Sequence, residues 1–315
     1  MRVRFRGIEH REAVLFEGPS GWGEFAPFLE YGDAESARWL AAGIESAYAA
    51  EPARVRDVVS VNATVPAVAA ESVGAVLARF DGCTTAKVKV AERGQALADD
   101  VDRVAAAREA MGPHGRIRID ANGGWDVETA AGALGKLTAY GLEYAEQPCA
   151  TVEELAELRA CLARRGIDVL IAADESIRRA GDPLRVSALE AADLIVVKAA
   201  PLGGVAAALE IVEASGLPAV VSSALDTSVG IAAGVRLAAT LPTLDHACGL
   251  GTVGLFADDV VDPPMAPVAG VLRPARPDPS VRRLAALAPS PGRQAWWRDR
   301  LGRAFDQLVA DGAGR

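Results

Sequence analysis

The sequence has little lysine and little histidine, and its cysteines do not follow a metal-binding or redox spacing. Only four of the 33 basic residues are lysine, and only three residues of 315 are histidine. A histidine-based zinc site is therefore not expected. The four cysteines contain no CxxC pair, so we expect reduced, mostly buried thiols in a cytoplasmic protein.

The chain also lacks long apolar runs and an excess of positive charge. Its formal net charge of −9 argues against nucleic acid as a partner, because phosphate binding needs a basic surface. The absence of a run of about twenty apolar residues argues against a membrane span, and the first residues do not form a signal peptide. With 50% hydrophobic residues a large core is expected. We expect a cytoplasmic monomer or small homo-oligomer that acts on a small molecule.

The scarce lysines stand out by their positions. Lys87 and Lys89 lie in Ala-Lys-Val-Lys-Val, and Lys198 closes Asp-Leu-Ile-Val-Val-Lys. Lys136 lies in a helical stretch and is interpreted as an ordinary solvated charge. Lysine can lose its proton under conditions in which arginine cannot. This difference favours a chemical role for the first three lysines, although solvation at strand ends is an alternative explanation.

From residue 58 onward, short β-branched runs alternate with alanine-rich helical stretches, as in repeated βα units. Eight parallel strands of this kind indicate a closed α/β barrel of the TIM type. A doubly wound open sheet is the alternative, but the glycine-rich loop expected after its first strand is missing. The predicted strands are 58–65, 87–90, 116–120, 142–146, 169–173, 194–198, 219–223 and, more weakly, 246–250; the predicted helices are 96–111, 127–140, 152–164, 204–214 and 228–240.

The two ends of the chain follow another pattern. Residues 1–57 contain alternating segments at 2–5, 12–16 and 21–24 that predict a small antiparallel sheet, followed by a helix over 34–50. This piece is too small to hold its own core and should pack on the barrel of residues 58–260. Residues 261–315 end in a predicted helix over 294–310. It carries an apolar stripe, interpreted as a docking face, of Trp296, Trp297, Leu301, Phe305 and Leu308.

Three acidic residues follow apolar strands at the barrel end where TIM-type active sites lie. Asp120, Glu146 and Asp174 belong to consecutive predicted strands. Buried carboxylates that converge repel each other, and a divalent cation is the simplest compensation. Oxygen ligands favour Mg²⁺, with Mn²⁺ as a second candidate. Taken singly, each acid could instead cap a helix or lie in a loop.

Lysines on both sides of a bound cation suit the removal of a proton α to a carboxylate. The product of that step is a doubly charged enolate, which a divalent cation stabilises. A lysine close to other cations has a lowered pKa and can act as the base near neutrality. Lys87 and Lys89, which face inward from one predicted strand, meet this requirement as a pair.

The ordered motifs Lys-X-Lys, Asp-Ala-Asn, Glu-Gln-Pro, Asp-Glu-Ser and a sixth-strand lysine resemble the muconate-lactonizing subgroup of the enolase superfamily. The resemblance implies a modified TIM barrel, (β/α)7β, with an α+β capping domain formed by the N- and C-terminal segments. It implies Lys89 as general base and Lys198 on the opposite side of the substrate, protonated and stabilising the intermediate. It further implies Asp120, Glu146 and Asp174 as metal ligands, and Asn122 and Glu175 as residues that orient the ligands or the lysines.

Within the subgroup, the resemblance is strongest to hydro-lyases that dehydrate a cyclohexadiene carboxylate bearing a succinyl group in menaquinone biosynthesis. The short cap, the segment 222–230 and the arginine two residues before Asp120 carry it. Residues 246–252 lack the Asp-X-Asp of relatives that act on dipeptides, but racemisation of N-succinylamino acids, another isomerisation and a catalytically inactive binding barrel stay open. The resemblance implies a lid over 21–31 and substrate contacts from Lys87, Arg118, Ser222, Ser223, Gly249 and Leu250.

Overall fold

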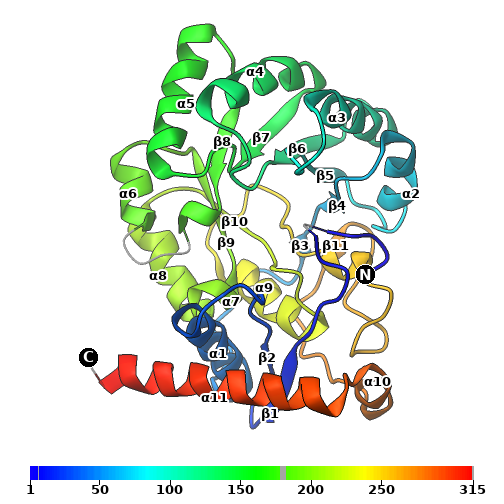
Figure 1. Cartoon of the computed structure of the whole chain (residues 1–315), viewed down its shortest axis with the longest axis vertical. Coiled ribbons are helices and arrows are strands. Elements are labelled where there is room, and N and C mark those ends of the chain that lie inside the picture. Colours follow the sequence, from blue (N-terminus) through cyan, green and yellow to red (C-terminus); the bar gives the residue numbers. More distant parts are fainter. Residues whose placement is uncertain (6, 178–181, 314–315) are drawn as a thin grey trace.

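Seven parallel strands form the wall of a barrel in the computed structural model, which describes residues 1–5, 7–177 and 182–313. Their order in the sheet, β10-β9-β8-β7-β6-β5-β4, follows the order along the chain (Figure 1). Each strand pairs in parallel with its neighbour, so their carboxyl ends meet at one end of the barrel. The strands are β4 (Ala63–Val65), β5 (Thr85–Lys89), β6 (Arg116–Asp120), β7 (Leu142–Glu146), β8 (Leu170–Ala173), β9 (Leu194–Val197) and β10 (Ala219–Val221).

The predicted eighth strand is reduced to two isolated parallel bridges. Gly249 pairs with Ser222 next to β10, and Cys248 pairs with Val61 near β4. These bridges join the two edges of the sheet, so the open doubly wound alternative is wrong. The approach is close, because a Cβ atom on Gly249 would lie 2.4 Å from the Ser222 hydroxyl. A larger residue here would force the Ser222 side chain to move.

Helices that connect consecutive strands cover the outside of the barrel (Figure 1). In α5, Thr151 and Glu154 form a capping box at the N-terminus, and Gly166 adopts a left-handed conformation at the C-terminus. The buried face of α5 is leucine-rich and packs into the core. The helices are α2 (Val73–Leu77), α3 (Leu97–Met111), α4 (Val127–Leu137), α5 (Val152–Arg165), α6 (Asp182–Ala188), α7 (Ala199–Leu202), α8 (Val205–Ser215) and α9 (Ser228–Thr240).

Both ends of the chain build the cap. The antiparallel strands β1 (Val14–Gly18) and β2 (Gly21–Phe25) pack with α1 (Asp33–Tyr48), and α11 (Pro291–Ala313) runs beside them (Figure 1). The predicted docking face of α11 is confirmed for Trp297, Leu301 and Leu308, which join the cap core. Trp296 and Phe305 are instead exposed. The chain also contains the short α10 (Val281–Leu287) and a small sheet of β3 (Val59–Ser60) and β11 (Val271–Leu272).

The N-terminal strand predicted over 2–5 is wrong. Phe5 forms only a bridge to Ile8, and the segment lies against the barrel, where the Arg2 amide donates to the Leu255 carbonyl. Among the residues that the structure describes, no strand offers this segment a ladder of backbone partners, so its alternating pattern does not produce a strand.

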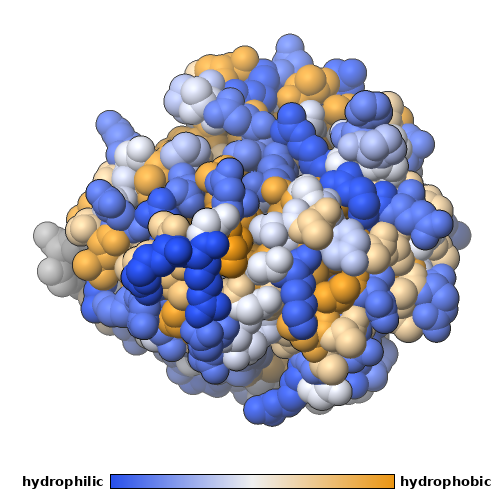
Figure 2. Space-filling model, turned by 90° about the horizontal axis from the view of Figure 1, so that it is seen from above, coloured by the Kyte–Doolittle hydropathy of each residue, from blue (hydrophilic) through white to orange (hydrophobic). Residues whose placement is uncertain are grey.

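None of the helices in the described residues is both long and apolar enough to cross a membrane. The space-filling view in Figure 2 shows hydrophilic side chains spread across the face that is seen from above. This agrees with the 24% of charged residues in the chain.

Candidate active site

The parallel register brings the predicted charged residues to one end of the barrel. Lys89, Asp120 and Glu146 lie opposite one another on β5, β6 and β7. Asp174 and Lys198 directly follow β8 and β9. All five side chains are buried, with between 1% and 7% of each residue exposed. The sheet therefore places two ammonium groups and three carboxylates together in a region that water scarcely reaches.

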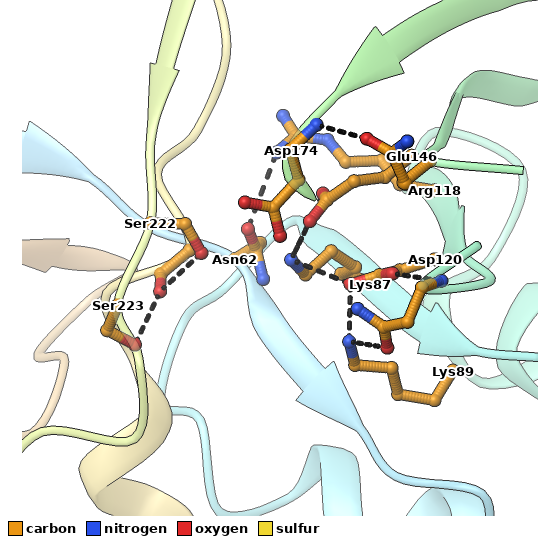
Figure 3. A network of polar contacts seen from close by, with 12 residues as sticks. Asn62, Lys87, Lys89, Arg118, Asp120, Glu146, Asp174, Ser222 and Ser223 are labelled. Carbon is orange, nitrogen blue, oxygen red and sulfur yellow. Dashed lines mark hydrogen bonds and ion pairs between the residues drawn. The ribbon is translucent and has the colours of Figure 1, made fainter. Parts of the chain in front are cut away.

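Lys87 bridges two of the carboxylates (Figure 3). Its Nζ atom lies 2.8 Å from Glu146 Oε1 and 3.3 Å from Asp120 Oδ2. Burial alone would lower the pKa of Lys87, but these two carboxylates raise it above its ordinary value. Burial and the neighbouring Asp120 raise the pKa of Glu146 to about 7, although Lys87 opposes them. The pKa of Asp120 is held well below its usual range, because Lys89 and Lys87 outweigh the effect of burial.

The other two lysines contact different carboxylates. Lys89 donates to Asp120 and, over 2.7 Å, to Asn122 Oδ1, whereas Lys198 pairs with Asp174. Lys89 ends β5 and Lys198 follows β9, and three strands separate β5 from β9 in the sheet. The two ammonium groups therefore enter the site from well-separated strands of the barrel wall.

Amide side chains fix the loops that follow the strands. Asn122 donates to Glu175 Oε1 over 3.2 Å, and Gln147 accepts from the Asp174 amide over 2.8 Å. Both Asn122 and Gln147 have a positive φ, 47° and 40° respectively, a conformation uncommon for residues other than glycine. Such backbone conformations occur often at functional sites, where surrounding contacts hold them in place. Here the hydrogen bonds of Asn122 and Gln147 connect the loops that follow β6, β7 and β8.

A cavity of about 30 Å³ opens beside these groups. This volume is far below the roughly 300–1,000 Å³ of typical ligand pockets, so a larger ligand requires movement of the lysine side chains or of the surrounding loops. Phe5 and Phe28 supply apolar walls, and the Lys89 Nζ atom lies 5.1 Å from the centroid of the Phe5 ring. The lining comprises Phe5, Phe28, Thr64, Lys87, Lys89, Asp120, Asn122, Lys198, Ser222, Ser223, Ala224, Leu225, Gly249 and Thr252.

Two predicted substrate contacts lie outside the cavity. Arg118 is fully buried in the barrel, where it contacts Glu143, donates to the Tyr144 hydroxyl over 3.0 Å and donates to the Ala247 carbonyl over 2.6 Å. Leu250 is likewise fully buried and belongs to the main core. Their positions favour a role in holding the barrel interior together. The other four predicted contacts, Lys87, Ser222, Ser223 and Gly249, line the cavity.

The carboxylates suit a hard divalent cation by their chemistry. Asp120, Glu146 and Asp174 offer only oxygen donors, and the repulsion that contributes to the raised pKa of Glu146 is the kind that a cation relieves. As arranged, no group of three acidic, histidine or cysteine side chains within the described part of the chain forms a metal cage. The Lys87 ammonium lies between two of the carboxylates and partly neutralises their charge.

A buried cluster beside the cavity was not predicted from the sequence. Glu24 of β2 accepts hydrogen bonds from Thr227 and Gly230 at the start of α9. Burial and Asp226 raise the pKa of Glu24 to about 8, against the opposing effect of Thr227 and Arg11. These residues lie about 200 positions apart in the chain, and their pairing has no local pattern that could have revealed it.

Comparisons with known protein families match nearly the whole chain. Residues 69–278 match a family described as enolase C-terminal domain-like, and residues 1–47 match one described as enolase N-terminal domain-like. A protein named o-succinylbenzoate synthase from Mycobacterium tuberculosis is 59% identical over 98% of this chain and 92% of its own length. One of the same name from Thermobifida fusca is 58% identical over 96% of this chain and 93% of its own length.

Solved structures show the same fold. A muconate lactonizing enzyme from Pseudomonas putida has a TM-score of 0.71 at 21% identity, covering 90% of this chain and 99% of that chain. The L-Ala-D/L-Glu epimerase from Bacillus subtilis has a TM-score of 0.70 at 25% identity, covering 85% of this chain and 89% of its own. These likenesses confirm the modified TIM barrel with its cap.

Proposed function

The chain belongs to the enolase superfamily, and we infer that it is an o-succinylbenzoate synthase. This hydro-lyase dehydrates 2-succinyl-6-hydroxy-2,4-cyclohexadiene-1-carboxylate to 2-succinylbenzoate in menaquinone biosynthesis. The observation that carries the inference is the identity of 58–60% to relatives of that name from several genera, each over at least 96% of this chain. The names of these relatives do not favour the alternative of an N-succinylamino acid racemase.

Lys89 is proposed as the general base. Its ammonium group lies at the cavity wall, held by Asp120 and Asn122. In its neutral form it removes the proton α to the substrate carboxylate, which gives an enediolate. The same lysine then protonates the departing hydroxyl group, so that water leaves and the ring becomes aromatic. Atoms balance, because one substrate yields one product and one water.

Lys198 is proposed to stay protonated on the other side of the substrate. It lines the cavity and is paired with Asp174. A fixed ammonium group stabilises negative charge that develops on the intermediate, and it can do so through the face of the ring. Lys87, Ser222, Ser223 and Gly249 are proposed to contact the substrate, whereas Arg118 and Leu250 support the barrel beneath it.

Mg²⁺ is the proposed cofactor, with Mn²⁺ as a substitute, and Asp120, Glu146 and Asp174 would hold it. When bound, the cation supplies positive charge to the substrate carboxylate during proton removal. Asn122 and Glu175 are proposed to orient this end of the site, since Asn122 connects Lys89 with Glu175. The chain's own contribution is to keep the base, the ammonium groups and the carboxylates in fixed positions.

The proposal extends to the organisation of the protein. We propose a cytoplasmic monomer or small homo-oligomer in which residues 1–57 and 261–315 form the cap and residues 58–260 form the catalytic barrel. The small-molecule substrate binds between the cap and the barrel, because Phe28 of the cap and the strand ends line the same cavity.

The test is an assay of the purified protein with Mg²⁺, in which 2-succinylbenzoate formation is followed by absorbance, with an N-succinylamino acid as a parallel substrate. We expect dehydration and its loss on chelation of the metal. Racemisation without dehydration would replace the proposed reaction by the alternative. In heavy water, a Lys198→Ala variant that loses exchange at the α-carbon only from the Lys198 face of the substrate would identify Lys198 as a second base, as a racemase requires.

A further inference from the structure

One wall of the cavity is formed by two loops that Arg11 joins. Phe28 comes from the loop after β2 in the cap, whereas Ala224 and Leu225 come from the loop between β10 and α9 in the barrel. The Arg11 guanidinium donates to the carbonyls of Ala26, Ala224 and Leu225, the last over 3.1 Å. A single side chain therefore holds carbonyl groups on both sides of the boundary between cap and barrel.

Arg11 also contacts the wall through an aromatic ring. Its guanidinium carbon lies 4.7 Å from the ring centroid of Phe28 and 5.7 Å from the ring centroid of Trp39. Phe28 is one of the residues that line the cavity. A planar guanidinium combines stacking on a ring with several hydrogen bonds in one plane, which a lysine ammonium cannot reproduce. The position of the Phe28 ring thus depends on the same group that fixes the loop from the barrel.

The barrel side of this wall has a backbone conformation that needs support. Leu225 has a φ of 60°, which is uncommon for a leucine. Its carbonyl is bound by Arg11, and the adjacent Asp226 carboxylate accepts from the Ala224 amide over 3.0 Å. Residues in such conformations persist only where surrounding contacts hold them. Arg11 is one of those contacts.

A second arginine fixes the cap side of the wall. Arg300 of α11 is 2% exposed and donates to the carbonyls of Phe28 and Tyr31 over 2.7 Å and 2.8 Å. The loop that carries Phe28 is therefore bound from the N-terminal segment by Arg11 and from the C-terminal helix by Arg300. Both ends of the chain converge on the same short loop.

We propose that Arg11 is a positioning residue that determines substrate affinity by preforming the cavity wall of Phe28, Ala224 and Leu225. This rests on the proposed function for the identity of the substrate. Arg11 itself does not line the cavity and makes no contact with the reacting groups. It acts through the residues that it holds, so its loss should weaken ground-state and transition-state binding alike and leave the proton transfer at Lys89 largely intact.

The chain offers a matched control in Arg56. Its guanidinium also binds three carbonyls, those of Ala238, Leu241 and Pro242, at the C-terminal end of α9. Arg11 holds the loop that precedes the same helix. Arg11→Met and Arg56→Met thus each remove an arginine that binds three carbonyls, two or more of them next to one end of α9, and only the Arg11 set lies at the cavity.

The experiment measures kcat and KM for the cyclohexadiene substrate together with hydrogen exchange of backbone amides. For Arg11→Met we expect KM to rise about tenfold with kcat within about threefold of wild type, and faster exchange over residues 26–31 and 222–228. For Arg56→Met we expect an unchanged KM and unchanged exchange in those segments.

Equal changes of KM in the two variants, or unchanged exchange over residues 26–31 and 222–228 in Arg11→Met, would overturn the inference. If wild type does not dehydrate the substrate, the proposed function fails, whereas the exchange comparison still decides whether Arg11 holds the wall. Should Arg11→Met not fold, Arg11→Lys is measured by the same criteria, because it keeps the charge but cannot bind three carbonyls and a ring at once.

Discussion

Lys89 is the residue on which the proposed chemistry depends. Its replacement by arginine keeps the positive charge but removes a base that can be deprotonated. We expect Lys89→Arg to lower kcat by at least about 100-fold, the usual contribution of general base catalysis. The measurement is the rate of dehydration at saturating substrate, with circular dichroism and the thermal midpoint as checks of folding.

Lys136→Arg is the control for this substitution. Lys136 is an exposed residue of α4, and its replacement tests whether any lysine-to-arginine change affects the assay. We expect unchanged kcat in this variant. More than a few per cent of the wild-type rate in folded Lys89→Arg would show that another group takes the proton.

Asp174 is expected to contribute to magnesium affinity. Asp174→Asn keeps the size of the side chain but removes a charged oxygen ligand, so we expect at least about tenfold weaker Mg²⁺ binding in isothermal titration calorimetry. Asp193→Asn serves as the control. Asp193 accepts from the Ile171 amide and contacts Arg159. These contacts lie near the amino-terminal ends of β8 and β9, whereas the candidate ligands lie at the carboxyl-terminal ends of the strands. Equal Mg²⁺ affinity in Asp174→Asn and wild type would exclude Asp174 as a ligand.

At the scale of residues, the sequence predicts groups whose position follows from local strand order. Asp120 and Glu146 are the last residues of two consecutive strands, so a parallel sheet brings them together without further information. Phe5 and Arg11 reach the cavity or its wall only through contacts with residues distant in the chain. Nothing in the sequence near them indicates such contacts, and for this reason both were missed.

At the scale of elements, the junction between β2 and α9 should respond to pH. The pKa of Glu24 is raised to about 8, so the folded protein retains a proton that the unfolded chain loses above its ordinary pKa. The stabilisation from Glu24 is then fully present at low pH and is lost as the pH rises towards 8. The free energy of unfolding should therefore fall less steeply with pH in Glu24→Gln than in wild type, by up to about 1.4 kcal/mol per pH unit. The measurement is urea unfolding between pH 5 and 8.

Glu143 provides a comparison in which the pKa is shifted in the opposite direction. Burial would raise its pKa, but hydrogen bonds and ion pairs with His246 and Arg118 lower it to about 2. The folded protein therefore releases this proton more readily than the unfolded chain, and the stabilisation is lost as the pH falls from about 4.5 towards 2. Glu143→Gln should therefore reduce the loss of stability between about pH 4.5 and 2. A slope equal to wild type in Glu24→Gln would contradict the prediction for the junction.

Element boundaries are predictable where a segment has neighbours on both sides. The ranges predicted for β6, β7 and α9 agree with the structure, because each combines a clear apolar period with a turn or cap. The segments 2–5 and 246–250 lie at the start of the chain and at the closure of the barrel, where few backbone partners are offered. An alternating pattern alone does not distinguish a paired strand from an extended segment.

At the scale of the whole molecule, the site depends on both ends of the chain. Trp297 of α11 packs edge-on against Phe25 at 6.0 Å, and Phe28 follows shortly after in the loop that lines the cavity. The barrel supplies the charged groups, whereas the cap supplies the wall that covers them. Loss of cap packing should therefore abolish activity before the barrel itself unfolds.

Adjacent tryptophans of α11 allow this to be tested. Trp297 is 3% exposed and Trp296 is 37% exposed, so Trp297→Ala should cost about 3–5 kcal/mol of cap stability and Trp296→Ala about 1 kcal/mol or less. In a urea titration, Trp297→Ala should lose activity at a lower concentration than its far-UV circular dichroism, since the helices and strands of the barrel dominate that signal. Trp296→Ala should lose activity and the circular dichroism signal at the same urea concentration, as wild type does. Coincident transitions in Trp297→Ala would show instead that cap and barrel unfold as one unit, because a single cooperative transition leaves no state in which the barrel persists without its cap.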